Sequence, residues 1–180
     1  MARVDGPGAG VGARIRALRE SRGLSLSALA AEAGIGKGTL SELETGQRNP
    51  TLDTLYAVAT PLGVPMAALM DDHDGAVIAG AGILATRMRV VREPGRTTEV
   101  YLLRLSPGAE RRSGAHVAGV EEQLVVLSGS GSVEYDDEVV AFGPGDHVRF
   151  AADRPHAYRG GPEGFEAVNV IVTPAGAVSS

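Results

Sequence analysis

The stretch Gly34-Ile-Gly-Lys-Gly-Thr-Leu-Ser-Glu-Leu-Glu44 decides the fold of the first half of the chain. Read at helical spacing, it turns Ile35, Leu40 and Leu43 inward. A short glycine-containing turn, residues 33–35, joins it to a preceding apolar helix. The pattern predicts a helix-turn-helix motif whose second helix has a polar outer side. The residues of that side are Lys37, Thr39, Ser41 and Glu42.

Three further segments with helical spacing accompany the two helices of this motif within residues 1–70. Ser25 is a favourable N-cap for the second predicted helix, and Gly34 ends that helix. Pro65 suits the start of the last helix, where a missing amide proton costs no hydrogen bond. The sequence therefore predicts a bundle of five helices, at residues 13–22, 26–33, 37–44, 52–62 and 66–70.

From Gly75 onward the hydrophobic period changes from 3.6 to 2. Short alternating segments are separated by turns rich in Gly, Pro and Asp, such as residues 143–146. Many short strands without a helical stretch predict an antiparallel sandwich or barrel, and about 100 residues suffice for one jelly roll. The predicted strands are 83–91, 98–105, 122–127, 131–135, 138–142, 147–150 and 167–172.

The two periods together predict an α+β protein of two domains. Asp71-Asp72-His73-Asp74 lies between them, and we interpret it as a solvated acidic hinge rather than a metal site. The expected organisation is a disordered arm at 1–12, a helical domain at 13–70, a linker at 71–80 and a β domain at 81–175.

The composition limits the possible classes of function. There is no Cys, which removes disulfides and thiolate metal sites and fits a reducing compartment. No apolar run reaches the roughly 18 residues of a membrane span, and the N-terminus lacks a signal-peptide core, so we expect a cytoplasmic protein. The net charge is -5, but residues 1–70 carry seven Lys and Arg against six Asp and Glu. Contact with DNA would have to rest on a local surface.

Several separate motifs occur in order in the first half: Leu24-Ser-Leu-Ser-Ala-Leu-Ala30, Thr39-Leu-Ser-Glu-Leu-Glu44, Gly46-Gln-Arg-Asn-Pro50, Leu52-Asp-Thr-Leu55 and Leu62-Gly-Val64. Over residues 15–70 they resemble the phage-repressor-like, XRE-type helix-turn-helix family. Two positions depart from the family pattern. Leu26 stands where many members carry Gln, and Glu42 stands where a basic or amide residue is common.

The resemblance implies a domain that binds double-stranded DNA. We expect it to bind a pseudo-palindromic operator as a homodimer, with half-sites about one helical turn apart. The helix would contact bases or phosphates, and the loop after it would contact the DNA backbone. The candidate DNA-contacting residues are Lys37, Gly38, Thr39, Ser41, Glu42, Gln47, Arg48 and Asn49.

The second half contains Gly114-Ala-His116, then Glu122 and Val-Leu-Ser-Gly129, then Gly143-Pro-Gly-Asp146 and Pro155-His156. These elements resemble the cupin family, whose active members hold a divalent metal with a His-x-His pair, a Glu and a later His. His116, Glu122 and His156 match three of those positions. The fourth ligand is absent: its place falls at Ala118 if His116 comes first in the pair, and at Gly114 if it comes second.

Two interpretations of this cupin site stay open. The three residues form either an open three-ligand site for one divalent transition metal (Fe, Mn, Ni or Zn) or a polar pocket without metal. Four further residues are candidates for a ligand pocket: Tyr101, Arg104, Arg149 and Tyr158. The alternative is that the two arginines lie on a solvated strand face and that the tyrosines pack in the core.

A DNA-reading domain joined to a small β domain predicts a transcriptional regulator. Its cupin domain would dimerise and bind a small-molecule or metal effector. The rival hypothesis is a metalloenzyme of the oxygenase or epoxidase type, which would use two His and one carboxylate. The missing His and the lack of an evident acid or base count against an enzyme, and we assign no catalytic residue.

Overall fold

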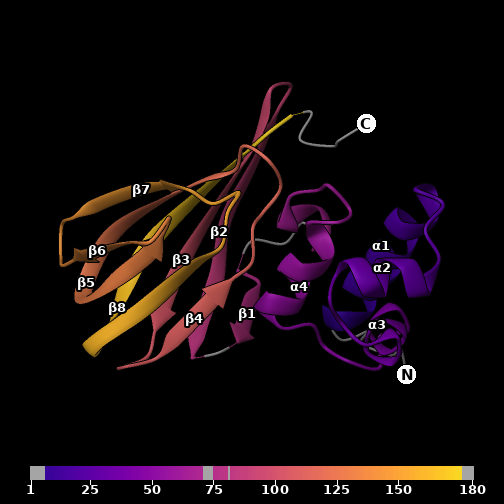
Figure 1. Ribbon diagram of the computed structural model, residues 1–180, viewed down its shortest axis with the longest axis horizontal. Helices are drawn as coiled ribbons and strands as arrows, with labels where there is room; N and C mark the ends of the chain where they lie inside the picture. The colour runs from indigo at the N-terminus through magenta and orange to yellow at the C-terminus, as the bar shows by residue number, and fades with distance from the viewer. Residues whose placement is uncertain (1–6, 71–74, 81, 176–180) are drawn as a thin grey trace. The chain divides into compact units, whose positions relative to one another are not determined.

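A computed structural model describes residues 7–70, 75–80 and 82–175 of the chain. These residues form two compact units, one helical and one β-rich (Figure 1). The helices come first in the chain and the strands follow, which confirms the α+β organisation predicted from the change of hydrophobic period. None of the described helices is long and apolar enough to cross a membrane.

The helical unit is built from short capped helices around an aliphatic core. The hydroxyls of Ser25 and Thr51 each accept a hydrogen bond from the amide three residues later, at 3.1 and 3.2 Å. Its elements are α1 (Pro7–Ser21), α2 (Leu26–Glu32), α3 (Lys37–Glu44), α4 (Leu52–Ala59) and a 3-10 turn, Met66–Ala68. The buried core side chains include Ile15, Leu29, Leu40, Leu43, Leu55, Val58 and Leu62.

The predicted disordered arm is partly helical. α1 begins at Pro7, whereas the prediction began the helix at residue 13; residues 1–6 of the predicted arm lie outside the described residues. Val11 is buried, and a Cβ atom at Gly12 would lie 2.0 Å from the carbonyl oxygen of Leu43. Glycine therefore allows α1 to pack closely against the end of α3, and this contact outweighs the low helix propensity of the segment.

The end of the helical unit also differs from the prediction. α4 ends at Ala59 rather than at residue 62, just before Pro61, which cannot donate a helical hydrogen bond. The fifth predicted helix, 66–70, is the three-residue 3-10 turn. The described residues thus contain four α-helices and not five.

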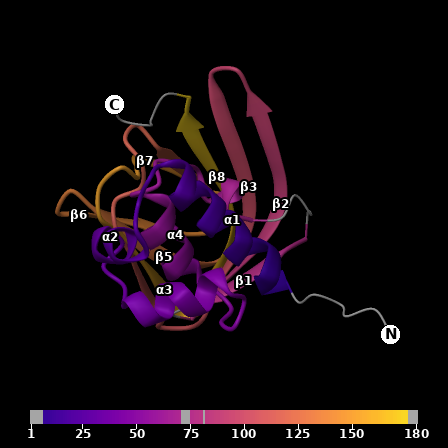
Figure 2. The ribbon, with the colours of Figure 1, turned by 90° about the vertical axis from the view of Figure 1, so that its right-hand side faces the viewer.

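The β-rich unit is one antiparallel sheet of eight strands among the described residues. Its strand order is β1-β2-β3-β8-β5-β6, with β4 beside β8 and β7 beside β5. Figure 2 shows the long hairpin formed by β2 and β3. The strands are β1 (Val77–Gly80), β2 (Ile83–Glu93), β3 (Arg96–Leu105), β4 (Glu110–Ser113), β5 (Glu121–Tyr135), β6 (Glu138–Phe142), β7 (His147–Ala151) and β8 (His156–Pro174).

Two long strands, β5 and β8, divide this sheet into two halves. The first part of β5 pairs with β7 and with the end of β8, which in turn pairs with β3. The last part of β5 pairs with β6 and with the start of β8, which pairs with β4. The pairing register shifts between the halves, where a Cβ atom at Gly129 would lie 2.1 Å from the carbonyl oxygen of Gly164. Glycine is required there because the backbones approach so closely.

Several strand predictions are wrong at the glycines. Predicted strands 122–127 and 131–135 are one strand, β5, because Gly129 marks an irregularity and not a turn. β8 begins at His156, eleven residues before the predicted 167, since its pairing with β5 covers 156–160 and resumes at Phe165 after an irregularity. β1 occupies part of the predicted linker 71–80, and β4 was not predicted because its sequence, Glu-Arg-Arg-Ser, has no apolar residue.

Candidate functional site

The predicted recognition helix α3 has one buried and one solvent-facing side. Leu40 and Leu43 are buried in the core, whereas Lys37, Gly38 and Glu42 are exposed. Thr39 and Ser41 are half-buried between these two sides. Gln47, Arg48 and Asn49, in the loop after the helix, are all exposed. The eight candidate DNA-contacting residues are therefore accessible, and their contact with DNA stays a prediction.

A buried ion pair fixes α3 against α1. The Arg19 guanidinium donates two hydrogen bonds to the Glu44 carboxylate, at 2.7 and 2.8 Å, and a third to the carbonyl of Leu24 at 2.9 Å. The Arg19 and Glu44 side chains are 11% and 7% exposed. The hydrogen bond from Arg19 to Glu44 raises the pKa of Arg19, so this guanidinium stays charged. The pair sets the orientation of the helix whose outer side would meet DNA.

The loop after α3 folds back onto the helix. The backbone amides of Gln47 and Arg48 both donate to the carbonyl of Glu42, at 2.8 and 3.2 Å. The Arg48 side chain also lies 3.2 Å from the Glu42 carboxylate. The acidic residue that departs from the family pattern is thus paired with a cation, which reduces the repulsion between Glu42 and a DNA phosphate.

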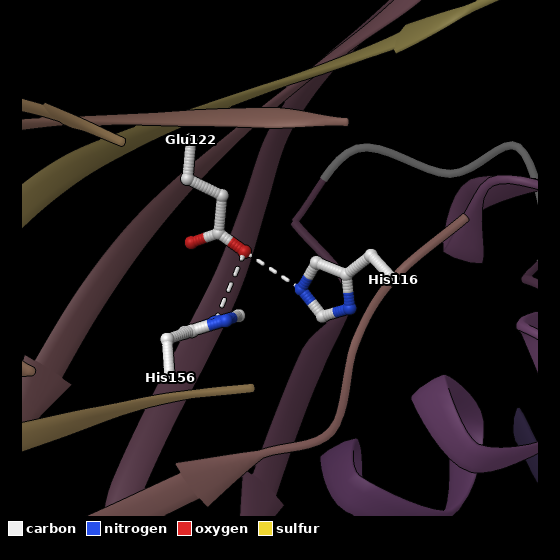
Figure 3. Close-up of side chains that lie close together, drawn as sticks. All are labelled: His116, Glu122 and His156. Atoms are coloured by element: carbon white, nitrogen blue, oxygen red, sulfur yellow. Dashed lines mark hydrogen bonds and ion pairs between the residues drawn. The ribbon is translucent and has the colours of Figure 1, made fainter. Parts of the chain in front are cut away.

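The three predicted metal ligands meet inside the β-rich unit (Figure 3). His116 precedes β5, Glu122 lies at its start, and His156 begins β8. The Nε2 atom of His116 lies 2.8 Å from Oε1 of Glu122, and Nε2 of His156 lies 3.7 Å from the same oxygen. All three residues are buried, and their possible ligand atoms lie within 4.8 Å of one another. Two strands and one loop, distant in sequence, supply this cluster.

Neighbouring groups orient the cluster. The Tyr158 hydroxyl and the Asn169 amide, at 2.9 Å, both donate to Oε2 of Glu122, so Oε1 is left to face the two imidazoles. The Nδ1 atom of His156 donates to the carbonyl of Arg154 at 3.0 Å, which makes Nε2 the unprotonated nitrogen. In the described part of the chain that Nε2 has no hydrogen-bond partner. Such outer contacts are typical of metal-ligating histidines.

The pKa shifts of the cluster favour its metal-binding protonation state. Burial opposes ionisation of Glu122, but the hydrogen bond from His116, the charges of both histidines and the Tyr158 hydroxyl together lower the pKa of this carboxyl. Burial also lowers the pKa of His156, against the opposing influence of the Glu122 charge. Near neutral pH the two side chains are therefore a carboxylate and a neutral imidazole, the forms that bind metal ions. The donor set fits one divalent transition metal.

The predicted pocket residues divide into two kinds. Tyr158 is buried and contacts Glu122, while Tyr101 is buried and donates to Oε1 of Glu99 at 2.9 Å. Arg104 and Arg149 follow the alternative of a solvated strand face, because both are exposed and form ion pairs with Glu166 and Glu121. Alternation along β3 and β7 places these arginines on the face opposite to the buried neighbours of each strand.

Sequence reasoning missed several buried polar residues of the β-rich unit, among them Arg87, Glu99, Arg111 and Asn169. A signal existed for Arg87, because it continues the inward alternation of Ile83 and Ala85 on β2. No comparable signal marks Arg111, which lies in a polar strand. A pocket of about 380 Å³ opens beside the cluster, and its lining includes Ser113, His156 and the turn between β5 and β6.

Known proteins match both halves of the chain. A helix-turn-helix family model matches residues 15–69, and a cupin-domain model matches residues 101–171. The HTH-type transcriptional regulator SutR of Escherichia coli (strain K12) is 33% identical over 153 residues, which cover 83% of this chain and 86% of SutR. The chain belongs to the helix-turn-helix transcriptional regulators that carry a cupin domain.

Two further proteins resemble this helix-turn-helix cupin regulator. The HTH-type transcriptional regulator Mb0023 of Mycobacterium bovis is 34% identical over 131 residues, and these cover 69% of this chain but only 43% of that longer relative. A solved helix-turn-helix family regulator from Vibrio cholerae superposes with a TM-score of 0.80 at 27% identity, covering 93% of this chain and 97% of that one. Both resemblances inferred from the sequence motifs are thus confirmed.

Proposed function

We propose that this regulator binds a pseudo-palindromic operator in double-stranded DNA as a homodimer in the cytoplasm. The recognition helix α3 would lie in the major groove, and each protomer would contact one half-site. The observation that carries this proposal is the exposed polar side of α3, held in place by the buried pair of Arg19 and Glu44.

Each candidate residue has a role that suits its chemistry. Lys37 and Arg48 are exposed cations and would contact phosphates. Thr39 and Ser41 carry hydroxyls that can donate to or accept from base edges. Gly38 has open space around it, since a Cβ atom there would meet no other atom within 4 Å, so DNA could approach the helix closely at this point.

Selection of bound fragments from the source genome tests the DNA-binding proposal. Fragments recovered with the full chain should share an inverted repeat whose half-sites lie about 10 base pairs, or a multiple of this, apart. The chain with Ser41→Ala and Thr39→Ala should recover no common motif, whereas the outer-face variant Arg104→Ala should recover the same one. Recovery of unrelated fragments by the unmodified chain would contradict the proposal.

We also propose that the β-rich unit is a jelly-roll barrel that holds one divalent transition metal through His116, Glu122 and His156. A bound metal supplies a Lewis acid with open positions for a small-molecule effector. The chain's own residues orient this site: Tyr158 and Asn169 fix one carboxylate oxygen, and the Arg154 carbonyl fixes the tautomer of His156. Such a ligand affects DNA binding only if it favours one arrangement of the two recognition helices.

Elemental analysis of the purified full chain after dialysis against metal salts tests the metal proposal. We expect about one metal ion per chain, and much less than one for His156→Ala, because a preformed donor set retains its ion. His147→Ala is the control, since this histidine is exposed and outside the cluster. Metal contents below ~0.1 per chain after supplementation would overturn the assignment.

A further inference from the structure

The outer face of the β sheet, turned away from the buried cluster, differs between the two halves of the sheet. In the half that contains β4, exposed charged residues form ion pairs, among them Arg159 with Glu110 at 3.3 Å and with Glu134 at 3.0 Å. In the half that contains β3, the outward residues of β3 and β8 are mostly aliphatic. Water solvates a charged face well, whereas an open aliphatic face is favoured as a contact surface.

Strand register aligns these aliphatic residues in adjacent rows. Leu102 on β3 pairs with Val168 on β8, and Val168 also pairs with Val125 on β5. The next row toward the turn between β2 and β3 joins Val100 to Val170. Their neighbours along each strand are buried, so alternation places all five residues on the outer face. We call these five residues the outer aliphatic patch.

The outer aliphatic patch is accessible in the described part of the chain. Val125 is 41% exposed, the adjacent Leu127 is 48% exposed, and the other four residues of the patch are half-buried. The exposed large hydrophobic residues among the described ones all belong to the β-rich unit. The helical unit thus offers no comparable apolar surface within its described residues.

The face around the patch is wide enough to be considered as an interface. It extends over five paired strands, β2, β3, β8, β5 and β7, and over the seven residues of β3 from Thr98 to Arg104. With about 4.8 Å between strands and about 3.4 Å between residues, it measures about 20 Å in each direction. Two such faces cover about 800 Å² in projection, and their accessible surface is larger because side chains make each face rough. This area approaches the roughly 1,200 Å² at which stable interfaces begin.

Two ion pairs flank the patch and balance its charge. Arg104 and Glu166 oppose one another in the row that follows Leu102, and they form one pair. Arg149 and Glu121 form the other, at 2.6 Å, beyond the opposite end of the patch. An apolar centre with a charged rim is the usual arrangement of protein interfaces. Two copies that each carry a net charge of -5 repel one another least where the charges of each copy cancel.

We propose that two copies of this chain form the homodimer through the outer aliphatic patch, with their β sheets packed face to face. This inference rests on the proposed homodimer and names its interface. A two-fold interface requires a surface that is complementary to itself, and an apolar centre between balanced ion pairs meets this requirement. The dimer would then supply the two recognition helices that a pseudo-palindromic operator needs.

Sedimentation velocity of the full chain, without DNA and after dialysis against EDTA, tests this inference. The unmodified chain should sediment as a dimer of two 18.5 kDa copies. Val125→Asp should raise the dimer dissociation constant at least about tenfold, because its carboxylate would be buried at the apolar centre without a partner. Val139→Asp is the matched control, since it introduces the same charge at an exposed valine of β6, in the other half of the sheet. An unmodified chain that stays monomeric up to about 0.1 mM would overturn the inference.

Further variants separate the interface from the fold. Circular dichroism checks that each variant is folded, and Val125→Lys replaces Val125→Asp if the latter does not fold. Arg104→Ala should keep the dimer, because an exposed ion pair at a rim contributes little free energy. A folded Val125 variant with an unchanged dissociation constant would contradict the assignment. A monomeric unmodified chain whose Tm falls with Val125→Asp, but not with Val139→Asp, would assign the patch to another segment of the same chain.

Two DNA probes distinguish this inference from the function on which it rests. Val125→Asp should bind a single half-site as the unmodified chain does, but the complete inverted repeat at least about tenfold more weakly, because linked recognition helices raise the effective concentration. An unmodified chain that dimerises through the patch but binds neither probe would overturn the proposed DNA binding and leave the interface standing. Full affinity of folded Val125→Asp for the inverted repeat, together with an intact dimer, would overturn the interface and leave DNA binding standing.

Discussion

The two candidate sites use polar residues in opposite environments. On α3 and the loop after it, the polar side chains lie in solvent or at its edge, and the exposed pair of Glu42 and Arg48 is 50% and 54% exposed. In the β-rich unit, Glu122 and the two histidines are buried, and Glu122 is held by Tyr158 and Asn169, which lie far from it in the sequence. An exposed polar side chain costs little free energy and can be substituted with little effect on its neighbours. A buried polar side chain is stable only while its hydrogen-bond partners are present. The comparison predicts effects of very different size in the two places.

The largest effect is expected at the centre of the buried cluster. Glu122→Gln keeps the size of the side chain but removes the carboxylate, so we expect the affinity for zinc to fall by about 100-fold or more. Competition with a chelating fluorescent indicator measures this affinity. Glu121→Gln, the adjacent and more exposed residue, should bind zinc as the unmodified chain does. Equal losses of zinc affinity in both variants would contradict a specific role for the buried carboxylate of Glu122.

A second large effect is expected at the buried pair behind the recognition helix. Arg19→Ala leaves Glu44 without its partner at a 7% exposed position, so the helical unit should lose about 2 kcal/mol of unfolding free energy. Urea denaturation followed by circular dichroism measures this loss. The exposed pair of Arg16 and Glu20 offers the matched control, and Arg16→Ala should leave the unfolding curve almost unchanged. Similar curves for both variants would contradict the role of burial.

Acid should destabilise the metal-free β-rich unit before the helical unit. The pKa of His156 is lowered from 6.5, so below pH 6.5 the unfolded state takes up a proton that the folded state does not. The pKa of Glu122 is lowered from 4.5, so its contribution is present above pH 4.5 and is lost as the pH falls further. Thermal unfolding between pH 7.5 and pH 5 measures the contribution of His156, and its extension to lower pH measures that of Glu122. A β-rich unit whose Tm stays constant over this range would contradict the buried, neutral state of His156.

A smaller effect is expected for single exposed cations. Lys37→Ala should weaken operator binding several-fold and reduce the slope of log affinity against log salt concentration by about 1. Fluorescence anisotropy at a series of salt concentrations measures both quantities. Arg104→Ala removes a cation from the exposed face of the β sheet and should leave the slope as it is. An unchanged slope for Lys37→Ala would remove this residue from the phosphate contacts.

The same contrast explains how much could be predicted from the sequence. The exposure of Lys37 and Glu42 follows from helical spacing, which is a local property, and the structure agrees with it. His116, Glu122 and His156 were found through their motif spacing, although their meeting depends on strand pairing. The pairing itself is long-range, so the register of β5 and β8 that brings Asn169 to Glu122 could not be predicted.

Glycine caused most of the remaining errors in the predicted fold. In a sequence, a glycine that ends a strand looks like one that allows two backbones to touch. Gly12 permits a helix contact where disorder was predicted, and Gly129 lies within a continuous strand where a turn was predicted. In an alternating strand, either of the two sets of residues can face the core. Arg104 and Arg149 belong to the sets that face solvent.

Operator affinity of three chains, measured with and without zinc, tests the central claim that the exposed surface reads DNA and the buried cluster controls it. We predict that Lys37→Ala binds the selected operator more weakly than the unmodified chain at every zinc concentration. Glu122→Gln should bind like the unmodified chain without zinc and show no response when zinc is added, while the unmodified chain responds. Equal operator affinity of all three chains under both conditions would contradict the account.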